Sequence, residues 1–346
     1  MVEIEKTGSD FIESSNVIQK VANGSGSKDV DIVVASSGSS SAAIVPASYV
    51  IYIDGSVIKA ANGTTGNIDY SGTDAYTVIH NAINSGDFIF IKPGLYKSSQ
   101  TFTFDKSWAY KKIKGVKGHT ILQSAGTNRL IYLKNENLLL NFEGITFDGN
   151  NTACNLIYAD DAETAGNRST YFVDCEIKNS SSNAIFIKGD NVDGVYFSRC
   201  YIVNNIGNIR LEIASPHIEF DDCFFIVNGP GYILKSLAGC VRFTNCLFVC
   251  MNNARGFIMN DLEGNTDWLG KVFVFSNCHI EGSINGSVFS IGNITTGYRY
   301  EQVIIENSWI ANENNPDYII DIQMMEGEVV GGSSAIIKNN LFSIFL

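Results

Sequence analysis

Carboxylates gather in two segments of the chain where the hydrophobic pattern is interrupted. The first segment holds Asp160 and Asp161, and the second holds Asp261, Glu263 and Asp267. Glycoside hydrolysis needs two carboxyl groups about 5–9.5 Å apart, one of which acts as the acid. These five residues are therefore the catalytic candidates. Because the chain has 36 Asp and Glu residues, simple solvated carboxylates are the alternative interpretation, and both stay open.

Three aromatic residues lie in similar interruptions and are candidates for binding a sugar. Trp268 follows the second acidic segment, and Tyr298 and Tyr300 lie in the segment 292–301. An aromatic ring can cover the apolar face of a sugar while neighbouring polar groups bind its hydroxyls. The alternative is that these rings only pack over the side of the fold.

A repeat that runs from Leu140 to Leu341 must position these segments. Two alternating apolar residues are followed by two turn residues, one fixed inward position and another apolar residue. The pattern occurs at least eight times, at intervals of 23 to 32 residues. Its fixed position is occupied by Ile145, Cys175, Cys200, Cys223, Cys246, Cys278, Ser308 and Asn340. Repeats of this length built from short alternating strands are typical of a solenoid.

The short runs between these positions favour a parallel β-helix. Three to five alternating residues are too few for a helix and cannot bury their apolar face alone. If each repeat makes one coil, equivalent residues stack about 4.8 Å apart and form a continuous core. The residue before the fixed position is Asp or Asn in six of the eight repeats, including Asp174 and Asn339. These residue types tolerate left-handed backbone angles, so we expect a ladder of bends along one corner.

The segment from Thr73 to Tyr96 resembles the start of the right-handed parallel β-helix proteins of the pectin-lyase-like superfamily. It reads as a capping helix, a first strand and a Pro93-Gly94-x-Tyr96 turn, and residues 113–122 are similar to the coil that follows. The resemblance covers about residues 70–346. It implies an all-β fold, a right-handed parallel β-helix (solenoid) with an N-terminal capping helix and a short leader. It implies little about activity, because lyases, hydrolases, esterases, tailspikes and inert adhesins share this fold.

The capping helix can be placed from its own residues. Asp74 is expected to cap its N-terminus, and the helix should run to Ser85. One apolar side is formed by Val78, Ile79, Ala82 and Ile83. This side would cover the first coil and hide an otherwise exposed sheet edge.

Five of the eight cysteines occupy the fixed inward position. Stacked β-carbons would lie about 4.8 Å apart, farther than the ~3.8 Å that a disulfide prefers. We therefore expect buried thiols that pack as small hydrophobic groups. Neither a metal site nor a cofactor is expected, since the cysteines lack C-x-x-C spacing and a nearby histidine.

Three regions are predicted along the chain. Residues 1–46 form a leader or attachment arm with a Ser/Gly-rich linker. Residues 47–72 form a β-hairpin leader, in which Asp54-Gly55 separates two apolar runs. Residues 73–346 form one β-helix domain, because a solenoid grows along a single axis.

Charge and hydropathy limit the partners of the chain. Asp and Glu number 36 against 24 Lys and Arg, giving a net charge of −12, which disfavours nucleic acid and anionic membranes. No stretch approaches the ~20 apolar residues of a membrane span. The first twenty residues show no apolar signal-peptide core. A location on a virion surface, or otherwise extracellular or at a cell surface, is expected without a visible signal.

The acidic and aromatic segments recur about fifteen residues after the fixed position, at one corner of the coil. Long loops there would form two walls around a floor of shorter coils. On this floor we expect Lys188, Arg210, Glu212 and Lys235 to point outward and to contact a ligand. The alternative for these charged residues is a self-neutralising ladder.

The sequence thus favours a surface or virion recognition protein, tailspike-like or receptor-binding, that binds a polysaccharide or cell-surface glycan through loops on one edge of the solenoid. Attachment to a larger assembly through the N-terminus is expected. An apolar, unplugged C-terminal strand favours an oligomer, a homotrimer by analogy with spike-like β-helices. A polysaccharide-cleaving enzyme, either a glycoside hydrolase or a lyase, is one alternative, and an inert structural rod is the other. The source, the glycan and the presence of catalysis stay open.

Overall fold

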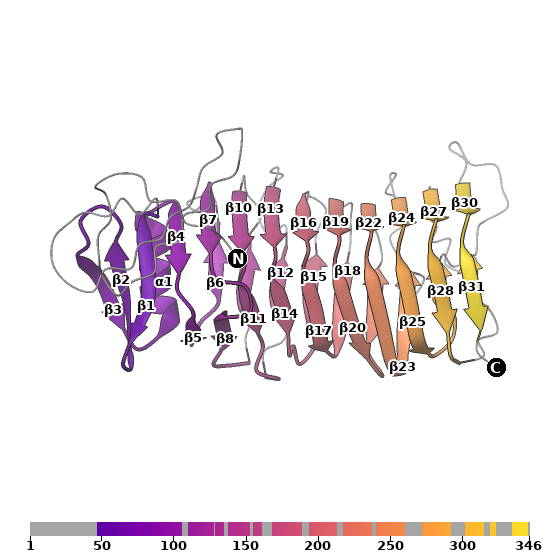
Figure 1. Cartoon of the computed structure of the whole chain (residues 1–346), viewed down its shortest axis with the longest axis horizontal. Helices are drawn as coiled ribbons and strands as arrows, with labels where there is room; N and C mark the ends of the chain where they lie inside the picture. Colours follow the sequence, from indigo (N-terminus) through magenta and orange to yellow (C-terminus); the bar gives the residue numbers. More distant parts are fainter. Residues whose placement is uncertain are drawn as a thin grey trace, which may run out of the picture.

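The computed structural model is a parallel β-helix whose coils follow one another along a single axis (Figure 1). It describes residues 47–105, 110–127, 129–134, 138–152, 155–160, 168–188, 194–212, 217–236, 240–259, 272–291, 302–314, 319–322 and 334–344. Among them there is one α-helix and 31 strands. The predicted fold class is confirmed.

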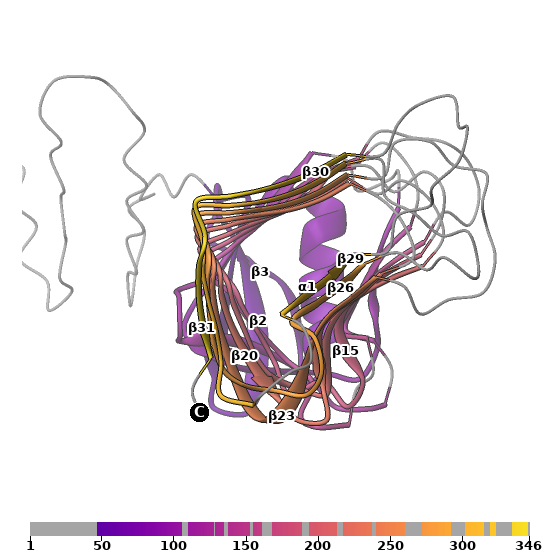
Figure 2. The ribbon, with the colours of Figure 1, turned by 90° about the vertical axis from the view of Figure 1, so that its right-hand side faces the viewer.

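Three sheets, named A, B and C, form the sides of the coil, and β23 continues from sheet B into sheet C (Figure 2). Sheet A contains β1 (Tyr49–Asp54), β2 (Val57–Asn62), β3 (Ile68–Gly72), β4 (Phe88–Ile91), β7 (Lys111–Lys114), β10 (Leu138–Glu143), β13 (Arg168–Val173), β16 (Val195–Ser198), β19 (His217–Asp221), β22 (Cys240–Thr244), β24 (Val272–Ser276), β27 (Gln302–Glu306) and β30 (Ser334–Lys338). Sheet B contains β5 (Gly94–Ser98), β8 (Thr120–Ser124), β11 (Thr146–Asp148), β14 (Glu176–Lys178), β17 (Tyr201–Asn205), β20 (Phe224–Asn228), the first half of β23 (Leu247–Met259), β25 (His279–Ile284), β28 (Trp309–Asn312) and β31 (Leu341–Ile344). Sheet C contains β6 (Phe102–Phe104), β9 (Ile131–Leu133), β12 (Ile157–Ala159), β15 (Asn183–Lys188), β18 (Gly207–Glu212), β21 (Tyr232–Ser236), the second half of β23, β26 (Phe289–Ile291) and β29 (Ile320–Ile322).

Strands β1 to β3 extend sheet A beyond the first coil. β1 and β2 form the predicted antiparallel hairpin, in which Asp54 pairs with Val57 and Gly55 has a φ of 64°. β3, which the sequence analysis did not predict, pairs antiparallel with β2. On its other side β1 pairs in parallel with β4, where Tyr49 lies opposite Ile89. The hairpin is therefore a hydrogen-bonded continuation of sheet A.

The helix α1 (Ala75–Ser85) covers the first coil as predicted. The Asp74 carboxylate accepts a hydrogen bond of 3.2 Å from the backbone N–H of Thr77 and so caps the helix. Its buried side is formed by Ala75, Val78, Ile79, Ala82 and Ile83. Figure 2 shows the helix lying across the space that the three sheets enclose. It shields the apolar interior at this end from water.

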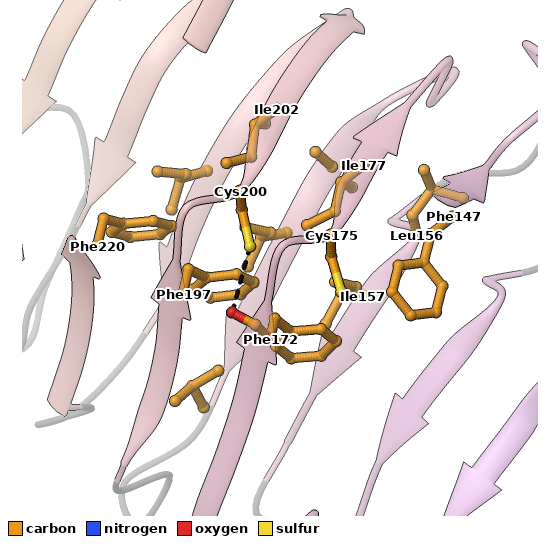
Figure 3. Packing of buried hydrophobic residues seen from close by; sticks show 14 of the residues in the cluster. Phe147, Leu156, Ile157, Phe172, Cys175, Ile177, Phe197, Cys200, Ile202 and Phe220 are labelled. Carbon is orange, nitrogen blue, oxygen red and sulfur yellow. Dashed lines mark hydrogen bonds between the residues drawn. The ribbon is translucent and has the colours of Figure 1, made fainter. Parts of the chain in front are cut away.

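Phenylalanine rings form a column on the inner side of sheet A (Figure 3). Phe172, Phe197, Phe220 and Phe243 follow one another with ring centroids 4.8–4.9 Å apart and planes within 8–9° of parallel. The parallel register sets this distance, because each ring lies one strand spacing from the next. All four rings are buried. Each short strand therefore buries its apolar face against the coils on either side.

The predicted column of cysteines runs beside these rings (Figure 3). Its members are free thiols, each at most 2% exposed: Cys175, Cys200, Cys223, Cys246 and Cys278. The thiols contact nearby carbonyl groups; Cys200 Sγ, for example, lies 3.2 Å from the carbonyl oxygen of Phe172 in the preceding coil. The prediction of buried thiols without disulfides is confirmed for these five residues.

Left-handed residues form the predicted ladder where sheet A turns into sheet B. The residue before the inward position has a φ between 51° and 66° in all eight repeats: Gly144, Asp174, Arg199, Asp222, Asn245, Asn277, Asn307 and Asn339. Six of these are the Asp and Asn residues predicted for the bend. Arg199 is the unexpected member. Its guanidinium makes two hydrogen bonds, of 2.8 and 3.1 Å, to the Asp174 carboxylate of the neighbouring coil.

Replacing Asn245 by valine is expected to lower the free energy of unfolding by about 1–2 kcal/mol, because a β-branched residue is strained at a positive φ. The Asn245 φ is 55°, and its side-chain amide donates a hydrogen bond of 3.2 Å to Asp221. Asn245→Gly also loses this bond but keeps the backbone freedom, so its loss should be smaller. Urea unfolding followed by circular dichroism measures both variants. Equal losses would show that the left-handed bend is not what selects this residue.

Candidate functional site

Five of the twelve site residues predicted from the sequence lie within the described part of the chain. They are Asp160, Lys188, Arg210, Glu212 and Lys235, and all are on the strands of sheet C or directly after one. The other seven, Asp161, Asp261, Glu263, Asp267, Trp268, Tyr298 and Tyr300, lie outside the described residues. Their roles therefore stay predictions.

The chain order places the three predicted loop segments at equivalent points of their coils. Residues 161–167 follow β12, residues 260–271 follow β23, and residues 292–301 follow β26. Each segment leaves a strand of sheet C and leads to the next strand of sheet A. The expectation of one shared corner agrees with this order. The groove between loop walls stays a prediction.

An outward row of side chains crosses sheet C perpendicular to its strands. The register places Tyr132, Tyr158, Phe186, Arg210 and Lys235 next to one another on β9, β12, β15, β18 and β21. Tyr132, Tyr158, Phe186 and Arg210 each lie between two buried apolar neighbours in sequence, and Lys235 follows the buried Leu234. The alternation of each strand therefore directs these side chains outward. The sequence analysis found the two cations but missed the three aromatic rings. Their signal was the recurring triplet of apolar, aromatic and apolar residues.

A fixed cation lies over the two tyrosines of this row. The Arg129 Cζ atom is 3.7 Å from the centre of the Tyr158 ring and 4.9 Å from that of Tyr132. The two ring centroids are 5.4 Å apart. Attraction between a guanidinium and an aromatic face holds the arginine in place, and the N–H donors of a guanidinium point along its own plane. Arg129 was not among the residues singled out in the sequence.

Hydrogen bonding and burial keep the phenols of this row neutral. The Tyr132 hydroxyl donates a hydrogen bond of 2.7 Å to Asp160 Oδ1. Burial, and then this carboxylate, raise the pKa of Tyr132, and burial also raises the pKa of Tyr158. Both hydroxyls are therefore donors at physiological pH. Asp160 acts here as an acceptor that orients a tyrosine.

Charged residues form a second outward row at the ends of the same strands. They are Asp105, Lys134, Asp160, Lys188 and Glu212, which alternate in sign from coil to coil. Lys188 lies opposite Glu212 in the register. Glu212 also forms an ion pair with Arg210, whose Cζ atom lies 5.3 Å from the centre of the Phe186 ring. The register supports the charge-ladder alternative for Lys188 and Glu212.

Cations outnumber acids on this face although the chain is acidic as a whole. From β6 to β21, the described residues of the outer face carry Arg129, Lys134, Lys188, Arg210 and Lys235 against Asp105, Asp160 and Glu212. The net charge of the chain is −12. The outer face of sheet C is thus a local cationic surface with aromatic rings beneath it, and it is suited to binding an anion.

The same face offers limited means for catalysis. Asp160 directly follows β12 and Glu212 is the last residue of β18, at equivalent positions two coils apart. Their backbones are therefore about 9.6 Å apart at the usual strand spacing. Inverting glycosidases hold two carboxyl groups about 6.5–9.5 Å apart. Here one carboxylate accepts from Tyr132 and the other is paired with Arg210. Within the described ranges, no group of three His, Cys, Asp or Glu residues could hold a metal ion.

Comparison with known proteins identifies no family. No protein-family model matches the sequence, and no curated protein matches it significantly. Among solved structures, the chain is similar to the ORF18 protein of Geobacillus virus E2, at 17% identity and a TM-score of 0.41, over 69% of this chain and 56% of the viral one. It is also similar to the A-module of a mannuronan C-5 epimerase from Azotobacter vinelandii, at 13% identity and a TM-score of 0.33, over 75% and 88% of the two chains.

A third similar structure is the catalytic domain of a GH87 alpha-1,3-glucanase in complex with tetrasaccharides. The identity is 12% and the TM-score 0.26, over 79% of this chain and 64% of that one. The outer face of sheet C itself is the basis for the function proposed below.

The helix that the structure describes is too short to cross a membrane.

Proposed function

We propose that the outer face of sheet C binds an anionic glycan and that the protein acts in surface recognition. The observation that carries this proposal is the position of Arg129 above Tyr132 and Tyr158. A guanidinium that is already fixed loses little entropy when it binds a planar anion, and it can donate two parallel hydrogen bonds to a carboxylate or sulfate.

The neighbouring coils extend this site along the solenoid axis. Arg210 and Lys235 continue the row of Tyr158 and Phe186, one residue per coil. Because equivalent positions recur at each strand spacing of about 4.8 Å, the face is an extended strip rather than a pocket. An extended strip suits a chain of sugars, whose repeated acidic groups can meet successive cations.

The net charge distinguishes between anionic partners. At −12 for the whole chain, long-range attraction to a polyanion such as nucleic acid is unfavourable. A glycan with isolated acidic groups needs only the local cations of sheet C. Membership of the pectin-lyase-like superfamily, a place on a virion surface and attachment through residues 1–46 are further parts of this proposal.

Assembly as a homotrimer also belongs to this proposal. The outer face of sheet B exposes apolar side chains, including Leu95 and Tyr201, at 44% and 45%. Such surface is suited to contact between protein chains. The mass in solution decides between a trimer and a single chain of 37.8 kDa.

Arg129→Ala is expected to weaken binding of an acidic oligosaccharide about 10–100-fold, because a charged hydrogen-bonded contact contributes about 1.5–3 kcal/mol. Titration calorimetry with an oligouronate, compared with a neutral oligosaccharide of the same length, measures the effect. Binding should also weaken as salt increases, since the contact is ionic and partly exposed.

Arg242→Ala supplies the matched control. Arg242 is an outward arginine of sheet A, 3.6 Å from Glu219, and its side chain is 52% exposed. Its removal changes the net charge by the same amount on another side of the solenoid. Equal losses for the two variants, or equal affinity for acidic and neutral sugars, would contradict a specific site on sheet C. If the protein binds no glycan on an array, the inert structural rod is the favoured alternative.

Polysaccharide cleavage is a second candidate, favoured only by the spacing of Asp160 and Glu212. In that case the protein would release reducing ends from the glycan that it binds, and Glu212→Gln would abolish the release while binding persists. Binding without product release assigns the face to recognition.

A further inference from the structure

A shallow concavity of about 730 Å³ lies on the outer face of sheet B, on a different side of the solenoid from the proposed glycan site. It is formed by β23, β25 and β28. The chain forms this hollow through an irregularity. Between two matching register pairs, Cys250 with Gly282 and Ala254 with Ile284, β23 has more residues than β25. The extra residues bend outward and form one wall.

Small residues lower the floor between the walls. Gly282 and Ala311 lie there, beside the larger side chains of the neighbouring positions. Gly282 has a φ of 112°, and a β-carbon on it would lie 2.0 Å from the carbonyl oxygen of Cys250. Only glycine fits this position. The depth of the concavity is therefore fixed by the backbone.

A hydrogen-bonded rim keeps the wall in place. Asn253 Oδ1 accepts from the Ser283 hydroxyl and from the Asn314 amide, both at 3.0 Å. The Asn314 amide also donates to the carbonyl of Ile284 at 3.0 Å. Three successive coils are joined in this way. The hollow thus exists before any ligand binds, and little ordering is needed on binding.

Two large apolar side chains form its apolar sides. Trp309 and Met251 are each 39% exposed. The Trp309 ring lies against His279, with centroids 4.2 Å apart, and its Nε1 is 3.3 Å from Ser343 Oγ. The indole is thereby oriented by residues of the two neighbouring coils. The register places Trp309 level with Leu247, two coils away and four residues before Met251, so the two side chains lie at opposite ends of the concavity. An exposed indole or thioether group is suited to covering an aliphatic chain or the apolar face of a ring.

Among the described residues that line the concavity, Glu281 and Glu313 carry carboxylates and none carries an amino or guanidinium group. Glu281 lies 3.2 Å from His279 Nε2, and its side chain is 46% exposed. The sign of this site is opposite to that of the outer face of sheet C. An indole face beside two acids attracts a cation through both its quadrupole and the Coulomb field.

We propose that this concavity binds a primary ammonium group carried on an apolar body, with the body against Trp309 and the ammonium beside Glu281 and Glu313. An amino sugar with free amines and a lysine side chain of a protein share this chemistry. The site is independent of the proposed glycan site on sheet C.

Calorimetry with the full chain tests the proposal with three probes: a glucosamine trisaccharide, its fully N-acetylated form and an acetylated, amidated lysine tripeptide. At least one amine probe should bind, and the acetylated sugar should bind at least about tenfold more weakly than the free amine. Glu281→Gln and Glu313→Gln should each weaken amine binding about 5–10-fold, and Trp309→Ala about tenfold.

Glu176→Gln is the matched control, because Glu176 lies on the same outer face of sheet B, outside the concavity, and is paired with Lys178 at 3.0 Å. The Glu176→Gln variant should bind amines as tightly as the unchanged chain does. Tighter binding of the glucosamine trisaccharide would identify an amino sugar as the ligand, and tighter binding of the lysine tripeptide would identify a lysine side chain of a protein. The proposal is overturned if neither amine binds, if acetylation makes no difference, or if Glu176→Gln weakens binding as much as Glu281→Gln.

Discussion

Replacing Phe220 by alanine is expected to lower the free energy of unfolding by about 3–5 kcal/mol. The Phe220 ring is fully buried and lies in the middle of the phenylalanine column, 4.8 Å from Phe197 and 4.9 Å from Phe243. It also meets the edge of Phe225 at 5.5 Å. The backbone hydrogen bonds fix the distance between coils, so the neighbouring rings cannot move together and fill the cavity. The variant therefore loses the free energy gained by burying the ring, and the empty cavity lowers the stability of its folded state further.

Phe224→Ala is the control for this prediction. Phe224 belongs to the same coil, but it points outward from sheet B and is only half-buried. The same change of side chain there leaves an opening to solvent rather than a cavity, so a loss below about 1.5 kcal/mol is expected. Urea unfolding of both variants gives the two free energies. Similar losses would mean that the interior column does not hold the coils together.

The inward half of this structure was predictable because stacking constrains it. Each inward residue must fit between its equivalents in the two neighbouring coils, so residue types recur, as at Cys175, Cys200 and Cys223. Corner residues need a positive φ, so Asp and Asn recur as well. The predicted thiol column and bends follow from these two requirements. The helix and the hairpin were predictable from local signals instead, the Asp74 cap and the Asp54-Gly55 turn.

The outward half is less constrained, and there the sequence analysis found less. Arg129, Tyr132, Tyr158 and Phe186 come together because the register aligns their coils, whereas nothing in the interior requires those residue types. The same holds for Trp309 and Glu281, which meet at a local irregularity of β23. Arg199 at a left-handed position was also missed, since its compensation comes from Asp174 in another coil. Strand β3 was missed because its residues are mostly exposed and lack an apolar alternation.

The thiols of the column provide a second large expected effect. Cys175, Cys223 and Cys246 should react with a thiol reagent at least about 1,000 times more slowly than Cys240 in the folded protein. The three are at most 2% exposed, whereas Cys240 is partly exposed. A buried thiol reacts only when its coil opens, and opening of a stable core costs about 5 kcal/mol or more, which is over three factors of ten. Mass spectrometry of labelled peptides measures each site separately.

The pH dependence of thiol labelling shows whether a cysteine reacts slowly because it is buried or because the reagent itself is slow. The thiolate is the reactive form, and burial raises the pKa of Cys175, Cys223 and Cys246, and that of Cys250 to about 12. Raising the pH from 7 to 9 should speed the labelling of Cys240, while the column should stay at least about 1,000 times slower, because its thiols react only after their coil opens. In urea all sites should react at similar rates, which controls for the reagent. Fast labelling of the column in the folded protein would show that water reaches the inner side of the coils, and the stacked interior that orients every outward residue could not then exist in this form.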